Sequence, residues 1–290
     1  DVESRWLGDV YKRHGKAVTE ELKNYEIFTP TSKELDITKR EKVEKYVLEK
    51  LPNIIINCAA YTNVDKAEVE KEHAYNINCV GTLNLAQICN KFDITLMHIS
   101  TDYVFDGKKA QYYSHKEDDE LYLNPITMYG ITKLQGEKNI INLCKKYYIL
   151  RTSWLFGDGK NFIRTIIRLS KENSEINVVN DQFGNPTYTV DLASIINQII
   201  IKQIPYGIYN ATNIGSTSWY ELAKKVLTYT KSNCIVNPIS TQNSDRKAVR
   251  PKNSRLDVTK LLKQGIEIPT YDNALERFLK IELKEITSCS

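Results

Sequence analysis

Short apolar segments alternate with helical patterns along the first half of this 290-residue chain. The clearest segment, residues 53–60, is apolar over consecutive positions, which is typical of a parallel strand buried on both faces. A helical pattern follows at 67–91, and a second apolar segment at 95–100 comes next. This alternation predicts right-handed β-α-β units and an open parallel sheet. We therefore expect an α/β fold with a Rossmann-like, doubly wound parallel sheet.

The same strand and helix patterns continue along the rest of the chain, but their alternation is less regular after Trp154. We therefore expect a main domain over 1–155 and a smaller α/β region over 156–290. Some segments of the second region are expected to return to the main sheet. Thr38 is expected to cap the second helix, and Ser216 or Thr217 the helix that contains Trp219. Further strands are expected at 26–28, 147–152, 176–179 and 207–210, and helices at 39–51, from 129, and at 161–171, 191–202, 218–229, 259–264 and 271–283.

Composition narrows the function classes. The net charge is only +4 and the charged residues are interspersed, so no basic stripe predicts a nucleic-acid partner. No apolar run approaches the length of a membrane span, and the first residues do not resemble a signal peptide, so we expect a cytoplasmic protein without membrane contact. The six cysteines lack Cys-x-x-Cys spacing, which favours reduced thiols, and the four scattered histidines predict no metal site.

The strand at 95–100 ends in polar groups. Thr101 follows it directly, and Tyr129 and Lys133 lie one helical turn apart further along the chain. These three side chains supply a hydroxyl, a proton donor and a cation. A carbonyl that accepts a hydride needs this set of groups.

The Tyr-x-x-x-Lys spacing alone is weak evidence, because the chain contains it four times. Context separates the copies. Only Tyr129 follows a strand that ends in Ser100 and Thr101, at a distance that returns the chain to the same sheet edge. The other copies fit amphipathic helices or a polar loop; they are Tyr46/Lys50, Tyr220/Lys224 and Tyr112/Lys116.

Longer motifs carry a strong resemblance to a known family, the dTDP-4-dehydrorhamnose reductases of the extended short-chain dehydrogenase/reductase superfamily. The resemblance runs from about Gly15 to the last helix. The motifs are Leu35-Asp-Ile-Thr38, Asn57-Cys-Ala-Ala-Tyr-Thr62, Val64-Asp-Lys-Ala-Glu68, Asn78-x-x-Gly81, Ser100-Thr-Asp-Tyr-Val-Phe-Asp-Gly107, Tyr129-Gly-x-Thr-Lys133, Arg151-Thr-Ser-Trp-Leu-Phe-Gly157, Asn180-Asp-Gln-Phe-Gly-x-Pro-Thr187 and Arg250-Pro-x-Asn-Ser-Arg-Leu256. The last two are the narrowest, and they favour this branch of the superfamily.

The resemblance implies reduction of the C4 ketone of dTDP-4-dehydro-L-rhamnose by NADPH or NADH, and it makes the first domain the dinucleotide-binding one. Thr101 would bind the ketone oxygen, Tyr129 would donate its proton, and Asn78 would anchor a relay water. Lys133 would bind the cofactor ribose and lower the pKa of Tyr129. A cation about 5 Å away, at an effective dielectric near 20, contributes roughly 3 kcal/mol, or about two pK units.

The resemblance also assigns binding residues. Gly15, Asp36, Ile37, Ala59, Ala60 and Tyr61 match cofactor contacts, together with Tyr129 and Lys133. Thr101, Asp102, Tyr129, Trp154 and Arg250 match substrate contacts, and the partner is a dTDP-sugar. Some relatives are metal-linked dimers, but no carboxylate here is assigned to such a site. A homodimer therefore stays an open expectation.

Structural interpretations stand beside these roles. Asp36 could cap the following helix, Trp154 could belong to the core, and the segment 180–184 could be only a turn. Arg250, Lys252 and Arg255 could form a solvated edge, although guanidinium groups also suit a diphosphate. At 29–32 no acidic residue is present to accept a ribose 2′-hydroxyl, and Lys33 is close, which favours NADPH.

The start of the chain departs from the family pattern. Gly15 fits the third glycine of the expected Gly-x-x-Gly-x-x-Gly turn, but Asp9 and Lys12 stand at the other two positions, and no apolar strand is evident before them. Three explanations compete: a truncated or wrongly assigned start, weak or absent cofactor binding, or replacement of the glycines by charge from Lys12, Arg13 and Lys16. The alternative functions are accordingly a non-catalytic binding or regulatory subunit, or a reductase or epimerase of another nucleotide sugar.

Overall fold

A six-stranded parallel sheet forms the centre of the computed structural model, which describes residues 5–8, 13–110, 112–244 and 248–288. All its strand pairs are parallel. The order β10-β5-β4-β3-β1-β2 reverses direction next to β1, as in doubly wound folds. The strands are β1 (Arg5–Gly8), β2 (Glu26–Phe28), β3 (Ile54–Asn57), β4 (Thr95–Thr101), β5 (Tyr147–Thr152) and β10 (Gly207–Asn210).

The first strand corrects the sequence analysis, which found no strand before Gly15. β1 pairs with β2 on one side and with β3 on the other. Backbone hydrogen bonds make these pairings, so a four-residue segment without an apolar run is sufficient for them. The positions of Asp9 and Lys12 lie outside the described residues. Gly15 is buried in the first turn of α1 (Arg13–Glu21).

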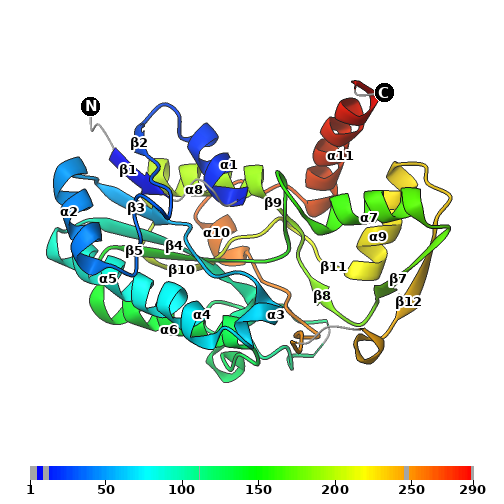
Figure 1. Cartoon of the computed structure of the whole chain (residues 1–290), viewed down its shortest axis with the longest axis horizontal. Coiled ribbons are helices and arrows are strands. Elements are labelled where there is room, and N and C mark those ends of the chain that lie inside the picture. The colour runs from blue at the N-terminus through cyan, green and yellow to red at the C-terminus, as the bar shows by residue number, and fades with distance from the viewer. Residues whose placement is uncertain (1–4, 9–12, 111, 245–247, 289–290) are drawn as a thin grey trace.

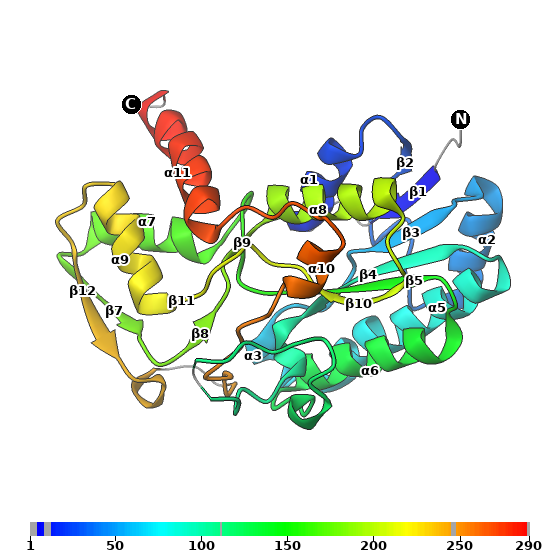
Figure 2. The same cartoon turned by 180° about the vertical axis from the view of Figure 1, so that it is seen from behind.

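Helices cover both faces of the sheet (Figures 1 and 2). On one face, α1, α8 (Thr189–Lys202) and α10 (Thr259–Lys263) enclose one apolar core with residues such as Met97 and Leu150. On the other face, α2 (Arg40–Lys50), α5 (Thr82–Lys91) and α6 (Met128–Leu143) enclose a second core with Leu96 and Ile149. Neighbouring residues of β4 and β5 thus point into opposite cores, which explains their continuous apolar sequences.

A smaller region lies beyond one end of the sheet, on the right in Figure 1. Its apolar core joins α7 (Phe162–Glu172), α9 (Trp219–Tyr229) and α11 (Tyr271–Ser288) with Ile176 and Val178. Because α8 and β10 also follow residue 155 but join the main sheet, the second half serves both regions. The domain boundary at 155/156 stays a prediction. The short strand pairs here are β7 (Glu175–Val179) with β12 (Ile235–Ile239), β6 (Leu155–Phe156) with β9 (Thr187–Tyr188), and β8 (Phe183–Gly184) with β11 (Thr217–Ser218).

The helix expected at 67–91 is confirmed from Lys71 to its end at Lys91, but it begins later than expected and contains a π-helical segment. It runs without interruption through α4 (Lys71–Tyr75), the π-helical segment η1 (Asn76–Gly81) and α5, and the short helix α3 (Val64–Ala67) precedes it separately. The side chain of Asn63 caps α3 by accepting from the Lys66 N–H. The side-chain amide of Asn78, in the π-helical segment, forms hydrogen bonds outside the helix, and π turns within α-helices are frequent at functional sites.

Both expected helix caps were also wrong. Thr38 donates to Asp36 Oδ1, so α2 begins one residue later without a side-chain cap. Ser218 itself caps α9 by accepting from the Glu221 N–H. Short 3₁₀ turns complete the described structure: η2 (Asp102–Val104), η3 (Glu120–Tyr122) and η4 (Thr241–Asn243).

Candidate active site

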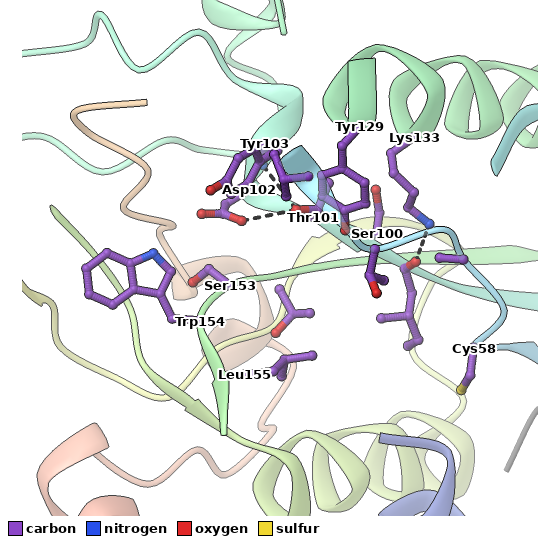
Figure 3. Close-up of a pocket in the computed structure, with 15 residues that line it drawn as sticks. Cys58, Ser100, Thr101, Asp102, Tyr103, Tyr129, Lys133, Ser153, Trp154 and Leu155 are labelled. Atoms are coloured by element: carbon purple, nitrogen blue, oxygen red, sulfur yellow. Dashed lines mark hydrogen bonds between the residues drawn. The ribbon is translucent and has the colours of Figure 1, made fainter. Parts of the chain in front are cut away.

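A pocket of about 460 Å³ opens where β3, β4 and β5 end. Figure 3 shows Tyr129 and Lys133 reaching into it from α6, with Thr101 and Asp102 below them and Trp154 on the opposite side. The structure therefore brings together six of the residues expected in the site: Ala60, Thr101, Asp102, Tyr129, Lys133 and Trp154.

The Tyr129 hydroxyl and the Thr101 hydroxyl are neighbours, as the sequence analysis required. The Thr101 hydroxyl also donates to Asp102 Oδ1 at 3.1 Å and accepts from the Tyr103 N–H at 3.2 Å. The ring of Tyr103 packs edge-on against that of Tyr129, with centroids 5.6 Å apart. Thr127 caps α6 by accepting from the Gly130 N–H, which fixes the first turn from which Tyr129 projects.

The expected acidity of Tyr129 is not found in this structure. Burial raises the pKa of Tyr129 to about 12, although the hydrogen bond with Thr101 acts in the opposite direction. Lys133 Nζ instead contacts the Ile99 carbonyl at 2.7 Å and His98 Nε2 at 2.8 Å. Desolvation of the phenolate therefore dominates the net shift, and the expected lowering of this pKa by Lys133 stays a prediction.

Asp102 is the carboxylate of the pocket, with 2% of its surface exposed. Burial raises the pKa of Asp102 to about 6, against the effect of hydroxyl donors such as Thr101. Its Oδ2 atom is buried and has no hydrogen-bond partner in the described part of the chain. A buried acceptor of this kind is suited to a ligand hydroxyl, because the hydrogen bond would remove a desolvation penalty.

Trp154 is held in place on several sides. Its indole stacks on Trp219 with centroids 3.6 Å apart and an interplanar angle of 8°. Its φ is +48°, an uncommon left-handed value for a residue with a side chain. A Cβ on Gly184 would lie 2.5 Å from the indole, so a glycine there is needed for close approach. Trp154 borders the pocket and also contributes to a core, so both interpretations of this residue apply.

The loop after β3 is tied to the helix that follows it. Asn78 Oδ1 accepts from the Tyr61 N–H at 2.7 Å, and its Nδ2 donates to the Tyr61 carbonyl and to Thr132 Oγ1. The side chain of Asn78 therefore fixes the loop that contains Ala59, Ala60 and Tyr61. Its expected role with a relay water stays a prediction.

Five expected cofactor residues are not in the wall of this pocket: Gly15, Asp36, Ile37, Ala59 and Tyr61. Asp36 accepts from the Thr38 N–H and hydroxyl, so its carboxylate orders a turn before α2. Ile37 packs on Gly81, where a Cβ would come within 2.6 Å. Gly15 lies in α1. Their cofactor contacts stay predictions. The alternative in which Asp36 caps α2 is wrong, because the cap residue is Lys39 and no side chain caps this helix.

Arg250 lies beside the pocket rather than in its wall. Its Nη2 donates to Asp65 Oδ2 at 2.8 Å, and its guanidinium lies 5.9 Å from the centroid of the Tyr103 ring. The Nε and Nη1 atoms are buried and have no hydrogen-bond partner among the residues the structure describes. Two N–H groups in this state are suited to an anion, so Arg250 is not part of a solvated edge.

The sequence analysis missed several residues of the site. His98 was read only as part of a strand, although it is the one imidazole in an otherwise apolar run, and that is the signal that could have identified it. The other three Tyr-x-x-x-Lys pairs do not line this pocket. The pocket residues that were not selected as site residues are Cys58, Thr62, Val64, Ile99, Ser100, Tyr103, Thr152, Ser153 and Leu155.

The described residues lack two further kinds of feature. No group of three or more His, Cys, Asp or Glu side chains is placed to hold a metal ion. No helix in the same residues is long and apolar enough to cross a membrane. Four of the cysteines are buried free thiols: Cys58, Cys79, Cys89 and Cys144.

Comparison with known proteins identifies the relatives of this chain. A dTDP-4-dehydrorhamnose reductase of Aggregatibacter actinomycetemcomitans is 40% identical over 268 residues, which cover 87% of this chain and 89% of the relative. A crystal structure of such a reductase from Clostridium acetobutylicum has a TM-score of 0.92 at 38% identity and covers 97% of this chain and 99% of that one.

A structure from Bacillus anthracis, solved in complex with NADP, has a TM-score of 0.90 at 41% identity, with coverage of 96% and 98%. The family model described as "RmlD substrate binding domain" matches residues 13–283. This chain therefore belongs to the RmlD family, the family of the dTDP-4-dehydrorhamnose reductases.

Proposed function

We propose that this protein reduces the C4 ketone of dTDP-4-dehydro-L-rhamnose to give dTDP-L-rhamnose, with NADPH as the reductant. The observation that carries the proposal is the convergence of Thr101, Tyr129 and Lys133 on one pocket at the carboxyl ends of parallel strands. Related proteins with the printed name dTDP-4-dehydrorhamnose reductase support the choice of substrate. The related structure in complex with NADP supports the choice of cofactor.

The residues present fit a nicotinamide cofactor. The pocket is bordered by Ala60 from the loop after β3 and by Lys133, whose Nζ is a hydrogen-bond donor at the pocket wall. Ala60 and Lys133 would hold the ribose portion of NADPH. Ala59 and Tyr61 lie in the same loop as Ala60 and would border the cofactor there. When bound, NADPH supplies the hydride that the ketone accepts.

The chain's own groups handle the oxygen of the ketone. Thr101 and Tyr129 present neighbouring hydroxyls, so both can hydrogen-bond to the same carbonyl oxygen. Tyr129 is a neutral phenol in this structure because burial raises its pKa to about 12. It therefore holds the proton that the developing alkoxide needs, and Lys133 supplies positive charge one helical turn away when it is protonated.

The substrate side of the pocket is suited to a sugar nucleotide. Trp154 offers an indole at the border of the pocket, and Asp102 offers an unpartnered carboxylate oxygen. The free N–H groups of Arg250 are suited to the diphosphate. A cytoplasmic location and a homodimer remain predictions of the sequence analysis.

The test is NADPH-dependent reduction of dTDP-4-dehydrorhamnose by wild type and by Tyr129→Phe. Loss of the general acid is expected to lower kcat by about 10²- to 10⁴-fold. Tyr220→Phe is the matched control, because Tyr220 begins another Tyr-x-x-x-Lys pair, in α9 and away from the pocket. Its rate should equal that of wild type.

Equal rates for Tyr129→Phe and wild type would remove Tyr129 from the mechanism. Product analysis with dTDP-, UDP- and GDP-4-keto sugars would show whether another nucleotide sugar is preferred. Absence of NADPH binding, measured by fluorescence titration, would leave a binding protein on a reductase scaffold.

A further inference from the structure

A buried ion pair adjoins the wall of the pocket, and nothing in the proposed function uses it. Glu137 of α6 and Arg151 of β5 are 0% and 1% exposed. Arg151 Nη2 donates to Glu137 Oε2 at 2.7 Å, and Nε of the same guanidinium donates to Oε1 at 3.1 Å and to Oε2 at 3.2 Å. The hydroxyl of Ser100 donates to Oε1 as well. One carboxylate therefore binds side chains of two neighbouring strands, β4 and β5.

These contacts join the elements that carry the reacting groups. Ser100 lines the pocket directly before Thr101, and it is the register partner of Arg151 in the sheet. Glu137 follows Tyr129 on α6 by about two helical turns, so the two side chains lie on the same face of the helix. The carboxylate thus ties the helix that carries Tyr129 to the strand end that carries Thr101.

The surroundings of the ion pair fix its geometry. A Cβ on Gly136 would lie 2.4 Å from the carbonyl oxygen of Asn78, so α6 packs closely on η1 beside Glu137. The guanidinium of Arg151 is held in turn, because its Nη1 donates to the Glu117 carbonyl at 3.1 Å. A planar guanidinium that binds a carboxylate through two N–H groups sets both the distance and the orientation of the two groups. The pair is therefore suited to fixing the position of α6 on the sheet.

Stability alone does not account for a buried ion pair. Removal of two charges from water has a desolvation cost that their attraction often only offsets, and apolar side chains of similar volume are frequently as stabilising. Apolar contacts do not prescribe one orientation, however, as a hydrogen-bonded fork does. The reduction needs such an orientation, because hydroxyls from two elements must reach the same ketone oxygen. A misplacement of about 1 Å can cost about 10²-fold in rate.

We propose that Glu137 is a positioning residue for the reduction. It holds α6 against β4 and β5, so that the hydroxyl of Tyr129 meets that of Thr101. This inference rests on the proposed function, because it takes these two hydroxyls as the groups that bind the ketone oxygen. Loss of the ion pair should lower kcat. KM for the sugar nucleotide should change little, because Asp102 and Trp154 lie outside α6.

The experiment replaces the pair by two methionines, which have a similar volume and no charge. Glu137→Met/Arg151→Met should unfold in urea at nearly the wild-type midpoint, while its kcat falls by roughly tenfold or more. Arg164→Met/Glu282→Met is the matched control, because it removes a bidentate ion pair between α7 and α11 in the smaller region. Its kcat should equal that of wild type. A role of Glu137 in stability alone would lower the urea midpoint and leave kcat unchanged.

Crystal structures of wild type and of Glu137→Met/Arg151→Met, both without cofactor, give a readout that does not depend on turnover. In the double variant we expect α6 to be displaced and the hydroxyls of Tyr129 and Thr101 to be separated. Hydroxyls that remain neighbours as in wild type, or a wild-type kcat, would overturn the inference.

A second variant decides the question if the double variant does not fold. Glu137→Asp keeps the charge opposite Arg151 but shortens the side chain by one CH₂ group, so the carboxylate cannot hold Ser100 and Arg151 with α6 in place. Its kcat should fall severalfold while its unfolding in urea stays cooperative. Glu282→Asp makes the same change in the smaller region and should keep the wild-type kcat. A wild-type kcat in Glu137→Asp would overturn this inference alone, whereas failure of wild type to reduce the ketone would overturn the proposed function as well.

Discussion

Single residues of the site hold conformations that their neighbours enforce. Trp154 combines a φ of +48° with stacking on Trp219 and contact with Gly184. A left-handed backbone costs about 1–2 kcal/mol for such a residue, and it persists only where the surroundings determine it. The indole is therefore pre-positioned at the pocket border, and we expect the sugar subsite to depend on residues that never touch the ligand.

Gly184→Ala tests this dependence. The new Cβ would lie 2.5 Å from the Trp154 indole, so the ring must move. Overpacking of this kind costs about 1–3 kcal/mol, and displacement of the ring should raise KM for the sugar nucleotide. Steady-state kinetics and cofactor titration are the measurements. NADPH affinity should not change, and a variant with wild-type KM would show that the position of Trp154 is unimportant.

The buried carboxylate of Asp102 predicts a pH-dependent stability. Its pKa is raised from an ordinary 3.8 to about 6, so the folded state binds the proton more tightly than the unfolded state. The carboxyl is neutral in both states below its unfolded pKa, and its burial penalty develops between pH 3.8 and about 6, above which it is constant at about 3 kcal/mol. Asp102→Asn should therefore be more stable than wild type at pH 8.

The same comparison at pH 4 is the internal control. There the stabilisation should largely disappear, because the wild-type carboxyl is protonated. Urea unfolding of both proteins at the two pH values gives the difference in their free energies of unfolding. If this difference is the same at pH 4 and at pH 8, Asp102 does not carry a buried charge.

Sequence reasoning identified most of the reacting groups but not their electrostatics. Thr101, Tyr129 and Lys133 were found because strand ends and helical spacing are local signals. The pKa of Tyr129 and the contact between Lys133 and His98 were not, because both depend on burial and on how α6 lies across β4. Arg250 was found by its motif, yet its ion pair with Asp65 joins residues far apart in the sequence.

At the scale of elements, the stretch from α3 to α5 shows what periodicity misses. The helical pattern at 67–91 continues through the π-helical segment, so the change in hydrogen-bond period does not appear in the sequence. The turn at 68–70, which separates α3 from α4, does not interrupt the pattern either. The strands β2, β5 and β10 were predicted with their exact bounds, whereas β1 was missed because its residues do not form an apolar run.

Asn78→Ala should loosen the loop at Ala59 to Tyr61. The change removes three hydrogen bonds and leaves buried partners unsatisfied, at a cost of about 1–3 kcal/mol. Because the loop is proposed to border the cofactor, its Kd should rise. Asn139→Ala is the control: it removes a hydrogen bond to Cys79 in the same π-helical segment but none to the loop. A similar Kd in both variants would separate Asn78 from cofactor binding.

At the scale of the whole molecule, the pocket lies at the border between the main sheet and the smaller region, because its wall residue Trp154 packs against the core of that region. Arg250 belongs to the segment between β12 and α10, and it pairs with Asp65 of α3, which packs on α6 of the main region. The wall residues Tyr103 and Trp154 likewise come from the main sheet edge and from the border of the smaller core. A ligand that spans these groups should therefore stabilise both regions at once.

Thermal unfolding with dTDP measures this effect. At a hundred times its Kd, a ligand that binds only the folded state adds about 2.7 kcal/mol, which for 290 residues corresponds to a rise in Tm of roughly 4 °C. In Arg250→Ala the rise should be much smaller, because the diphosphate loses the two free N–H groups. Arg168→Ala, an exposed arginine paired with Glu172 on α7, should keep the full rise. If Arg250→Ala keeps it as well, the diphosphate does not bind at Arg250, and the nucleotide must enter the pocket from another side.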